Sequence, residues 1–344
     1  MKANSSGLCP CREFVKEIKN TPFTIFHPVA DLGYFGWSPK TIEHKKLVDV
    51  TAEDILDRVE PSMVPDKVVS ARQLDRMCPL KFEPSSSTQK HINRFPYDDG
   101  YVTALHVALK RLNDAWSDIK CQFMFSGSTL NMLAAKSSKA PSEYFAQVVP
   151  GTSIILLVKH LEYEVDHSAE GFQFEQLATG GSVSDVHSKD IVEHLQIMDV
   201  GGHRVLFAAE CDGMDEAGNP VEVKASNPRH WENKTMFQMM SSGSLNVHAG
   251  QRRQNALQGV KSFSLGQVTR KATNGKNVAA LQANILNGIQ TLKTAFEAGS
   301  FDNGKVWNFI VNWRGEFELT AVEDRYLLLP PLEVVEKLLE SNQL

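Results

Sequence analysis

Two short acidic motifs in the middle of the chain contain residue types that could bind a metal ion. They are Glu210-Cys211-Asp212 and Glu222-Val223-Lys224. Side chains two positions apart on a β-strand point to the same face. Glu210 and Asp212 should therefore point the same way, as should Glu222 and Lys224. If the two segments pair, three carboxylates and one ammonium group converge near the strand ends.

Such a cluster would favour phosphate chemistry. Carboxylate oxygens suit hard cations such as Mg²⁺ or Mn²⁺. A bound ion of this kind polarises a phosphate, lowers the pKa of a bound water and stabilises the leaving oxygen. Lys224 would position or activate that water, or neutralise charge that builds up on the phosphate. An acid followed by acid-x-lysine is the pattern of the PD-(D/E)xK nucleases.

The same spacing has a simpler interpretation, because acids and lysines alternate on the solvent-exposed face of many hairpins. The flanking residues favour the metal site. Val205 to Ala209 is apolar at every position, which indicates a strand buried on both faces. Placing acids at the end of a buried strand is costly unless a partner compensates their charge.

Hydrophobic periodicity predicts the elements that position these motifs within one α/β domain spanning residues 1–344. Segments 204–212 and 221–225 are expected to form a hairpin, because residues 213–220 have turn chemistry. Residues 1 to about 95 look irregular and rich in proline, and we expect them to pack on the core. The other expected elements are helices at 52–59 (N-cap Thr51), 99–119 and 278–298 (N-cap Asn277), strands at 122–125 and 153–158, and a final hairpin at 306–313 and 316–322.

Composition limits the class of protein. The chain has 344 residues and a net charge of −5, which argues mildly against a protein that coats duplex DNA. No apolar run approaches the length of a membrane span, and residues 1–17 lack the apolar region of a secretory signal. The five scattered cysteines are expected to be reduced thiols. We therefore expect an intracellular protein, nuclear or cytoplasmic, with no membrane association.

Three ordered motifs resemble those of the decapping exoribonuclease (DXO) family of RNA 5′-end quality-control enzymes. The family pattern is G-x-x-x-E, then E-h-D, then E-h-K, where h is hydrophobic. Gly171 to Glu175 resembles the first motif, and the two acidic motifs resemble the second and third. Gln254 to Val260 is similar to the family's glutamine-containing helix. Residues 26–35 resemble the family's N-terminal strand and residues 327–330 its C-terminal end, so weak similarity covers most of the chain.

The resemblance implies a fold, a set of site residues and an activity. The fold is two packed mixed β-sheets surrounded by helices, with a PD-(D/E)xK nuclease-like core. Glu175, Glu210, Asp212 and Glu222 would be ligands of Mg²⁺ or Mn²⁺, and Lys224 and Gln254 would position the water and the scissile phosphate. Arg252 and Arg253 stand where the family usually has an aromatic pair, and they could hold the RNA backbone or form a merely solvated surface. The implied partners are RNA 5′ ends and a protein of the RNA-processing machinery, and the implied reactions are decapping (including NAD caps), pyrophosphate removal and 5′-to-3′ degradation.

The sequence departs from the family at one expected arginine, where Ser126 stands instead. Serine lacks the guanidinium fork that binds phosphate in a bidentate way, a loss of about 2–4 kcal/mol in the transition state if nothing substitutes. Arg94, Lys136, Lys139 or Arg229 could substitute in space. Two hypotheses therefore stand: an active metal-dependent RNA 5′-end hydrolase, and a catalytically impaired RNA- or partner-binding protein. A DNA nuclease is a weaker third.

Overall fold

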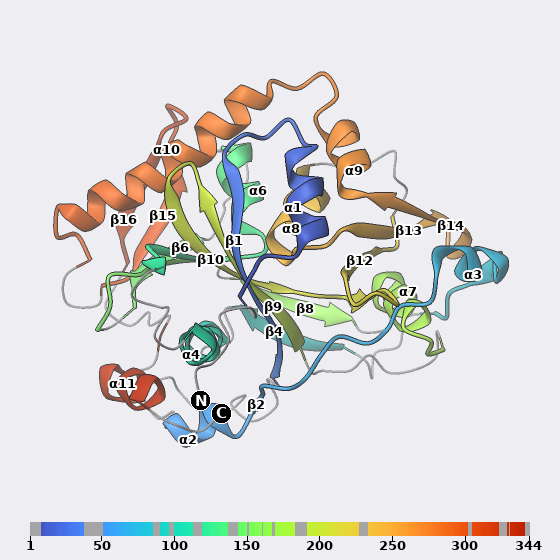
Figure 1. Cartoon of the computed structure of the whole chain (residues 1–344), viewed down its shortest axis with the longest axis horizontal. Helices are drawn as coiled ribbons and strands as arrows, with labels where there is room; N and C mark the ends of the chain where they lie inside the picture. The colour runs from blue at the N-terminus through green and yellow to red at the C-terminus, as the bar shows by residue number, and fades with distance from the viewer. Residues whose placement is uncertain are drawn as a thin grey trace.

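A computed structural model shows how the chain folds (Figure 1). The structure describes residues 8–37, 51–84, 90–95, 100–112, 119–136, 144–149, 151–159, 161–166, 169–182, 191–226, 233–301, 305–322, 329 and 331–340.

A nine-stranded mixed sheet forms the centre of the fold. Its two parallel pairings, of β5 with β10 and with β7, lie in the middle, and the other neighbours are antiparallel. The strand order is β16 (Phe317–Ala321), β15 (Trp307–Val311), β6 (Tyr144–Val148), β7 (Ile155–Lys159), β5 (Phe123–Ser126), β10 (His203–Glu210), β9 (Ile191–Val200), β1 (Phe26–Trp37) and β2 (Val59–Glu60).

A five-stranded mixed sheet lies beside the first, and a two-stranded sheet completes the β-structure. The five-stranded sheet has the order β11 (Gly213–Met214), β12 (Pro220–Lys224), β13 (Asn246–Arg253), β14 (Ala256–Ser264) and β3 (Leu80–Lys81). The two-stranded sheet pairs β4 (Lys90–Phe95) with β8 (Leu161–Asp166). Two mixed sheets with surrounding helices confirm the fold class that the motif resemblance implied.

Helices cover both faces of the large sheet. Val205 and Phe207 of β10 pack on one side in a core with α1 (Arg12–Lys19), α6 (Thr129–Ala135), α8 (Asn233–Ser242), α9 (Leu265–Ala272) and α10 (Val278–Glu297). Leu206 and Ala208 pack on the other side in a core with α2 (Ala52–Leu56), α4 (Gly100–Leu112) and α11 (Leu332–Glu340). This alternation follows from the period of two in a strand. Two further helices, α3 (Ala71–Arg76) and α7 (Glu170–Ala178), contribute Leu74 and Phe174 to a third core with the five-stranded sheet.

The predicted pairing of the two acidic strands is wrong. β10 lies between β9 and β5 in the large sheet, whereas β12 belongs to the smaller sheet and pairs with β11 and β13. A strand that is apolar on both faces takes a central place with a neighbour on each side, so β10 has no free edge for residues 221–225. The hairpin of β12 is instead the short one with β11.

The irregular structure expected for residues 1 to about 95 is a partial error, whereas the strand that the family resemblance implied at residues 26–35 is confirmed. Residues 26–37 form β1, which pairs with β9 along its length. Register shifts between Pro28 and Ala30 and between Asp31 and Gly33 accommodate the proline and the positive φ of Gly33 within the strand. Strands β5 and β7, the β15–β16 hairpin and helix α10 confirm the other predictions, as do the side-chain N-caps of Thr51 and Asn277. Helix α2 ends at Leu56, three residues before the predicted end, because Val59 belongs to β2. Helix α4 confirms the predicted helix at 99–119 as far as Leu112, and residues 113–118 lie outside the described residues.

Among the residues that the structure describes, no helix is both long enough and apolar enough to cross a bilayer.

Candidate active site

The acidic motifs meet where the two sheets adjoin. Glu210 is the last residue of β10, and Asp212 follows it just beyond the strand. Asp212 reaches into the other sheet, because its Oδ2 accepts a hydrogen bond of 2.7 Å from the backbone N–H of Val223 in β12. The chain reversal through β11 therefore brings both motifs together, although the strands that carry them do not pair.

Lys224 is the cation of this cluster. Its Nζ forms an ion pair with Glu222, two residues before it on β12, and lies 3.4 Å from Oδ2 of Asp212. The Glu222 side chain is only 4% exposed and that of Asp212 10%, whereas Lys224 retains 25% of its surface. The predicted common orientation of Glu222 and Lys224 is thus observed, and the lysine is the most solvent-accessible of the three.

Helix α7 brings Glu175 to the same place. Phe174 and Leu177 of the helix pack against Val221 and Val223 of β12 in the third core. Gln173 fixes α7 further, because its amide accepts a hydrogen bond of 2.8 Å from the N–H of Glu83 and donates one of 3.0 Å to the carbonyl of Glu83. Glu175 is half-buried and close enough to interact electrostatically with all four charged residues of the two motifs.

Burial and the crowding of negative charge raise the pKa values of three acids in the cluster. Burial raises the pKa of Glu222, the charge of Lys224 lowers it and the charge of Asp212 raises it again, so that the pKa is raised to about 7. Burial and the charge of Asp212 raise the pKa of Glu210 to about 7, although this residue keeps exposed surface. Burial and Asp212 also raise the pKa of Glu175 well above its ordinary value. One ammonium therefore does not balance four carboxylates.

The same carboxylates stabilise the charged form of Lys224. Burial alone would lower the pKa of Lys224, but Asp212, Glu222 and Glu175 raise it well above its ordinary value. Lys224 is consequently a stable ammonium group in this environment. It can hold or neutralise an anion, but it does not act as a proton acceptor while the carboxylates surround it.

The cluster fits a divalent cation in chemistry and in charge. All its donors are carboxylate oxygens, and their mutual repulsion is the kind that a hard cation relieves. The side chains are not positioned as ready-made ligands: among the described residues, no three His, Cys, Asp or Glu groups are arranged to hold a metal ion. Lys224, which pairs with Glu222 and Asp212, contacts two of the carboxylates that an ion would need.

Ser126 adjoins this cluster on the large sheet. It ends β5 and pairs with Ala208, two residues before Glu210. Its hydroxyl lies 3.0 Å from that of Thr129 and 3.3 Å from that of Ser128, and it is hydrogen-bonded to Tyr101 of α4. A network of hydroxyl groups thus occupies the position at which the family resemblance predicts a guanidinium group.

Glu193 is a fifth carboxylate near the cluster, and its place was not predicted from the sequence. Glu193 of β9 lies directly opposite Glu210 in the strand register. Burial and then the charge of Glu210 raise the pKa of Glu193 to about 8, against a hydrogen bond with Trp37 that lowers it. An acid within an otherwise apolar strand was the available signal, but only the register reveals its neighbour.

Gln254 does not lie on a helix, so this prediction is wrong. It lies in the turn between β13 and β14 with a φ of 55°, and its side chain is exposed. Lys224 pairs with Ala249, so the turn lies about 16 Å further along the strand, at about 3.3 Å per residue. The neighbouring Asn255 is a common turn residue, and this signal was present in the sequence.

The basic residues that could contact RNA or replace the expected arginine lie in different parts of the fold. Both Arg252 and Arg253 are exposed, and Arg252 forms an ion pair with Glu170 at the start of α7. Lys136 ends α6 and lies over the ring of Phe317 at 5.5 Å, away from the cluster. Arg94 lies in β4, and Lys139 and Arg229 fall outside the described residues.

A glutamine-bearing helix does follow the E-h-K motif, but it is α8. This helix carries Gln238, whose Oε1 is buried and has no hydrogen-bond partner among the described residues. Helix α8 packs against β9 and β10 of the large sheet. The run of Met and Phe residues around Gln238 has helical spacing, which was the missed signal.

No protein-family model and no curated protein sequence matches the chain. Solved structures do match it in fold. Candida albicans Rai1 in complex with pU5-Mn²⁺ has a TM-score of 0.56 and 14% identity, and the match covers 92% of this chain and 97% of that one. K. lactis Dxo1 in complex with manganese has a TM-score of 0.55 and 12% identity, and the match covers 88% of this chain and 91% of that one.

A third match is S. pombe Rai1, with a TM-score of 0.54 and 13% identity over 85% of this chain and 94% of that one. These identities are low, so the comparison establishes architecture alone. The chain has the fold of the Rai1 and Dxo1 proteins, which is the fold that its three ordered motifs predicted.

Proposed function

We propose that this protein is a metal-dependent hydrolase that acts on the 5′ ends of RNA. The observation that carries the proposal is the meeting of Glu175, Glu210, Asp212, Glu222 and Lys224 where the two sheets adjoin. The shared fold supports it, because matching structures include a Rai1 protein in complex with pU5-Mn²⁺ and a Dxo1 protein in complex with manganese.

The four carboxylates would hold Mg²⁺ or Mn²⁺. The ion, when bound, supplies Lewis acidity toward a phosphate and lowers the pKa of a bound water. Binding would require Lys224 to release at least one carboxylate, and its ammonium group would then face the phosphate anion instead. Asp212 would stay in place during this exchange, because the N–H of Val223 holds its Oδ2 independently of the lysine.

Two residues outside the acidic cluster complete the proposed site. Gln238, whose buried Oε1 lacks a partner in the described part of the chain, takes the role that the resemblance gave to Gln254. It would orient the substrate phosphate or the water through its amide. Arg253, exposed at the β13–β14 turn, would contact the RNA backbone.

A panel of labelled substrates tests the proposal. RNAs with triphosphate, monophosphate, unmethylated-cap and NAD 5′ ends, and a 5′-phosphorylated DNA of the same sequence, are incubated with Mg²⁺ or Mn²⁺. We expect metal-dependent product from at least one RNA end. Cleavage of the DNA in preference to every RNA would contradict the RNA assignment and favour a DNA nuclease.

The second candidate function is binding without efficient hydrolysis. Ser126 favours it, because hydroxyl groups replace a phosphate-binding guanidinium beside Glu210. In that case the panel yields no product from any end, while RNA still binds in a filter or anisotropy assay. Binding without turnover at both metals would establish this alternative.

A further inference from the structure

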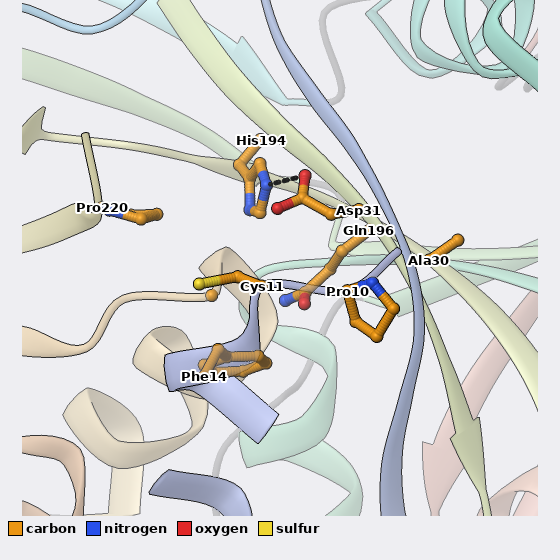
Figure 2. A pocket seen from close by; sticks show the side chains of 9 residues that line it. Pro10, Cys11, Phe14, Ala30, Asp31, His194, Gln196 and Pro220 are labelled. Atoms are coloured by element: carbon orange, nitrogen blue, oxygen red, sulfur yellow. Dashed lines mark hydrogen bonds and ion pairs between the residues drawn. The ribbon is translucent and has the colours of Figure 1, made fainter. Parts of the chain in front are cut away.

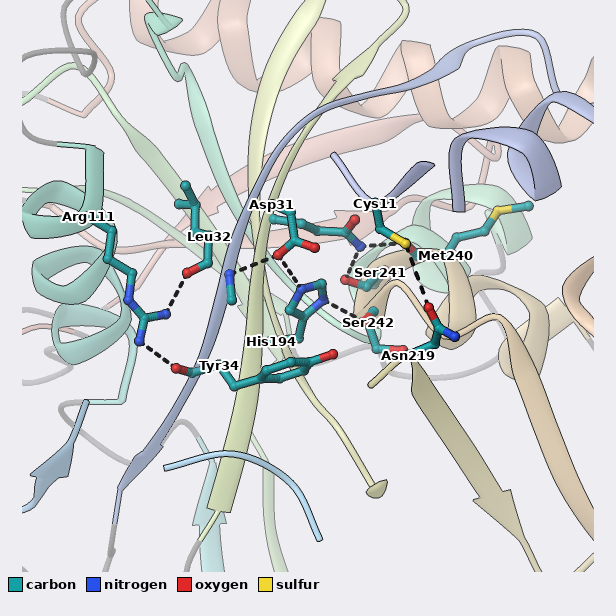
Figure 3. A network of polar contacts seen from close by, with 12 residues as sticks. Cys11, Asp31, Leu32, Tyr34, Arg111, His194, Asn219, Met240, Ser241 and Ser242 are labelled. Carbon is teal, nitrogen blue, oxygen red and sulfur yellow. Dashed lines mark hydrogen bonds and ion pairs between the residues drawn. The ribbon is translucent and has the colours of Figure 1, made fainter. Parts of the chain in front are cut away.

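A buried histidine joins two strands to the end of helix α8 (Figures 2 and 3). His194 of β9 is 3% exposed. Its Nε2 lies 2.9 Å from Oδ1 of Asp31 on β1, and its Nδ1 lies 2.7 Å from the carbonyl oxygen of Ser242, the last residue of α8. The ring of Tyr34 lies alongside, with the ring centroids 4.7 Å apart.

The two hydrogen bonds determine the protonation of His194. A backbone carbonyl only accepts, so Nδ1 must carry a proton. Asp31 is ionised: burial would raise its pKa, but the contacts with His194, the N–H of Gly33 and the charge of Arg111 leave the pKa lowered. A carboxylate also only accepts, so Nε2 carries a proton as well. Both ring nitrogens of His194 therefore face hydrogen-bond acceptors.

The same strand face binds the whole C-terminal end of α8. Gln196, two residues after His194, donates from Nε2 to the carbonyls of Met240 at 2.8 Å and Ser241 at 2.7 Å. Together the two side chains satisfy three carbonyls that a helix end leaves without intrahelical partners. A cation is also favoured there, because the C-terminal end of a helix carries partial negative charge.

Gly243 makes this close approach possible. It follows α8 with a φ of 73°, and a Cβ added to it would lie 3.0 Å from the imidazole ring of His194. The small pocket against His194, lined by Cys11, Phe14 and Pro220 among others, has a volume of about 10 Å³ (Figure 2). That is room for about one water molecule.

We infer that His194, as an imidazolium held by Asp31, is a positioning residue that fixes α8 and thereby Gln238. Ser242 lies one helical turn after Gln238, so a shift of the helix end moves the amide. The connection to hydrolysis rests on the proposed function, whereas the anchoring of α8 does not.

Two structural measurements test the anchoring. Nitrogen-15 NMR of the imidazole rings near neutral pH should show both nitrogens of His194 protonated. Hydrogen exchange should be at least about tenfold faster in the last turn of α8 for His194→Gln than for the wild type. The control is His203→Gln, which changes a half-buried histidine on the neighbouring β10. A neutral His194 ring, or unchanged exchange in α8, would overturn the inference.

A double-mutant cycle tests the positioning of Gln238. His194→Gln should lower kcat by roughly tenfold to a hundredfold with little change in KM, and should have no further effect in a Gln238→Ala background. Independent effects of the two substitutions would overturn positioning through Gln238. Asp31→Asn, which keeps an acceptor but removes the charge, provides a milder variant if His194→Gln does not fold. A wild-type protein without RNA hydrolysis would refute the proposed function, and the NMR and exchange results would still decide the anchoring.

Discussion

The ammonium group of Lys224 in β12 lies 3.4 Å from Oδ2 of Asp212, which lies between the end of β10 in the large sheet and the start of β11 in the smaller one. The same oxygen accepts a hydrogen bond of 2.7 Å from the N–H of Val223, so the backbone and the lysine of β12 both hold Asp212. A cation of the chain thus already neutralises part of an acidic cluster that is suited to a metal ion. Metal binding and the lysine–carboxylate contacts are expected to compete.

Asp212→Asn separates the chemical role of this residue from its structural one. The amide oxygen of asparagine still accepts the N–H of Val223, so the fold should persist. Loss of the charge removes a proposed metal ligand, and we expect the cleavage rate to fall at least about a hundredfold, since each 1.4 kcal/mol of lost stabilisation is tenfold. Single-turnover kinetics measure the cleavage rate of Asp212→Asn and of Glu216→Gln, a control that changes an exposed acid. A rate within about twofold of the control would rule out Asp212 as a ligand.

Glu193 should make the stability of the metal-free protein depend on pH. Its pKa is about 8 in the folded chain, against an ordinary value of 4.5. The folded state keeps a proton that the unfolded state has lost, so this contribution to stability is complete below about pH 4.5 and is lost as the pH rises through about 8. The Tm should therefore fall between pH 6 and pH 9, and Glu193→Gln should reduce the fall.

The matched control for this experiment is Glu316→Gln, which changes an exposed acid beside the turn of the β15–β16 hairpin. Differential scanning calorimetry at several pH values compares the three proteins. If the Tm of Glu193→Gln follows the wild-type curve over the whole range, Glu193 does not hold the proton that its position predicts.

Substitutions of Gln238 and of Gln254 should differ in their effect on the rate of RNA hydrolysis. Gln238→Ala should slow RNA hydrolysis by roughly tenfold or more, because it removes the amide that we propose to orient the phosphate or the water. Gln254→Ala should change the rate by less than about twofold, and Gln254→Gly should be tolerated well, because glycine adopts a positive φ without strain. Steady-state kinetics of the three variants decide between the residues. A larger defect at Gln254 would restore it as the site glutamine.

Arg252 and Arg253 should differ in how they affect RNA binding. Arg253→Ala removes an exposed cation and should weaken binding while reducing the slope of log K against log salt concentration by about 1. Arg252 pairs with Glu170, so Arg252→Ala should act mainly on α7 and leave the slope nearly unchanged. Anisotropy titrations at several salt concentrations measure both. Equal slopes for the wild type and Arg253→Ala would exclude a backbone contact by Arg253.

Local patterns predicted the elements of the fold better than their pairing. The period of α10 and the cap of Asn277 are properties of neighbouring residues, so the sequence was sufficient for them. The partner of a strand depends on distant segments instead. An apolar run such as 205–209 indicates burial on both faces, but nothing local shows that β9 and β5 occupy its two edges.

The candidate site was predictable to the same degree. The order of its motifs identified the five charged residues that the structure brings together. The role of Gln254 was inferred from a short string without testing its turn chemistry, so a hairpin was mistaken for a helix. Glu193 and His194 could not be singled out, because their importance comes from cross-strand and helix-end neighbours that are remote in sequence.

The central claim is tested most directly by cleavage of a 5′-end-labelled RNA in the presence of Mn²⁺. The wild type is compared with the double variant that combines Asp212→Ala and Glu222→Ala. The account predicts product from the wild type that disappears when the metal is chelated and that the double variant does not form, although both proteins are folded. Product that forms equally with the double variant, or no product from any 5′ end while RNA remains bound, would contradict a metal-dependent hydrolase at this site.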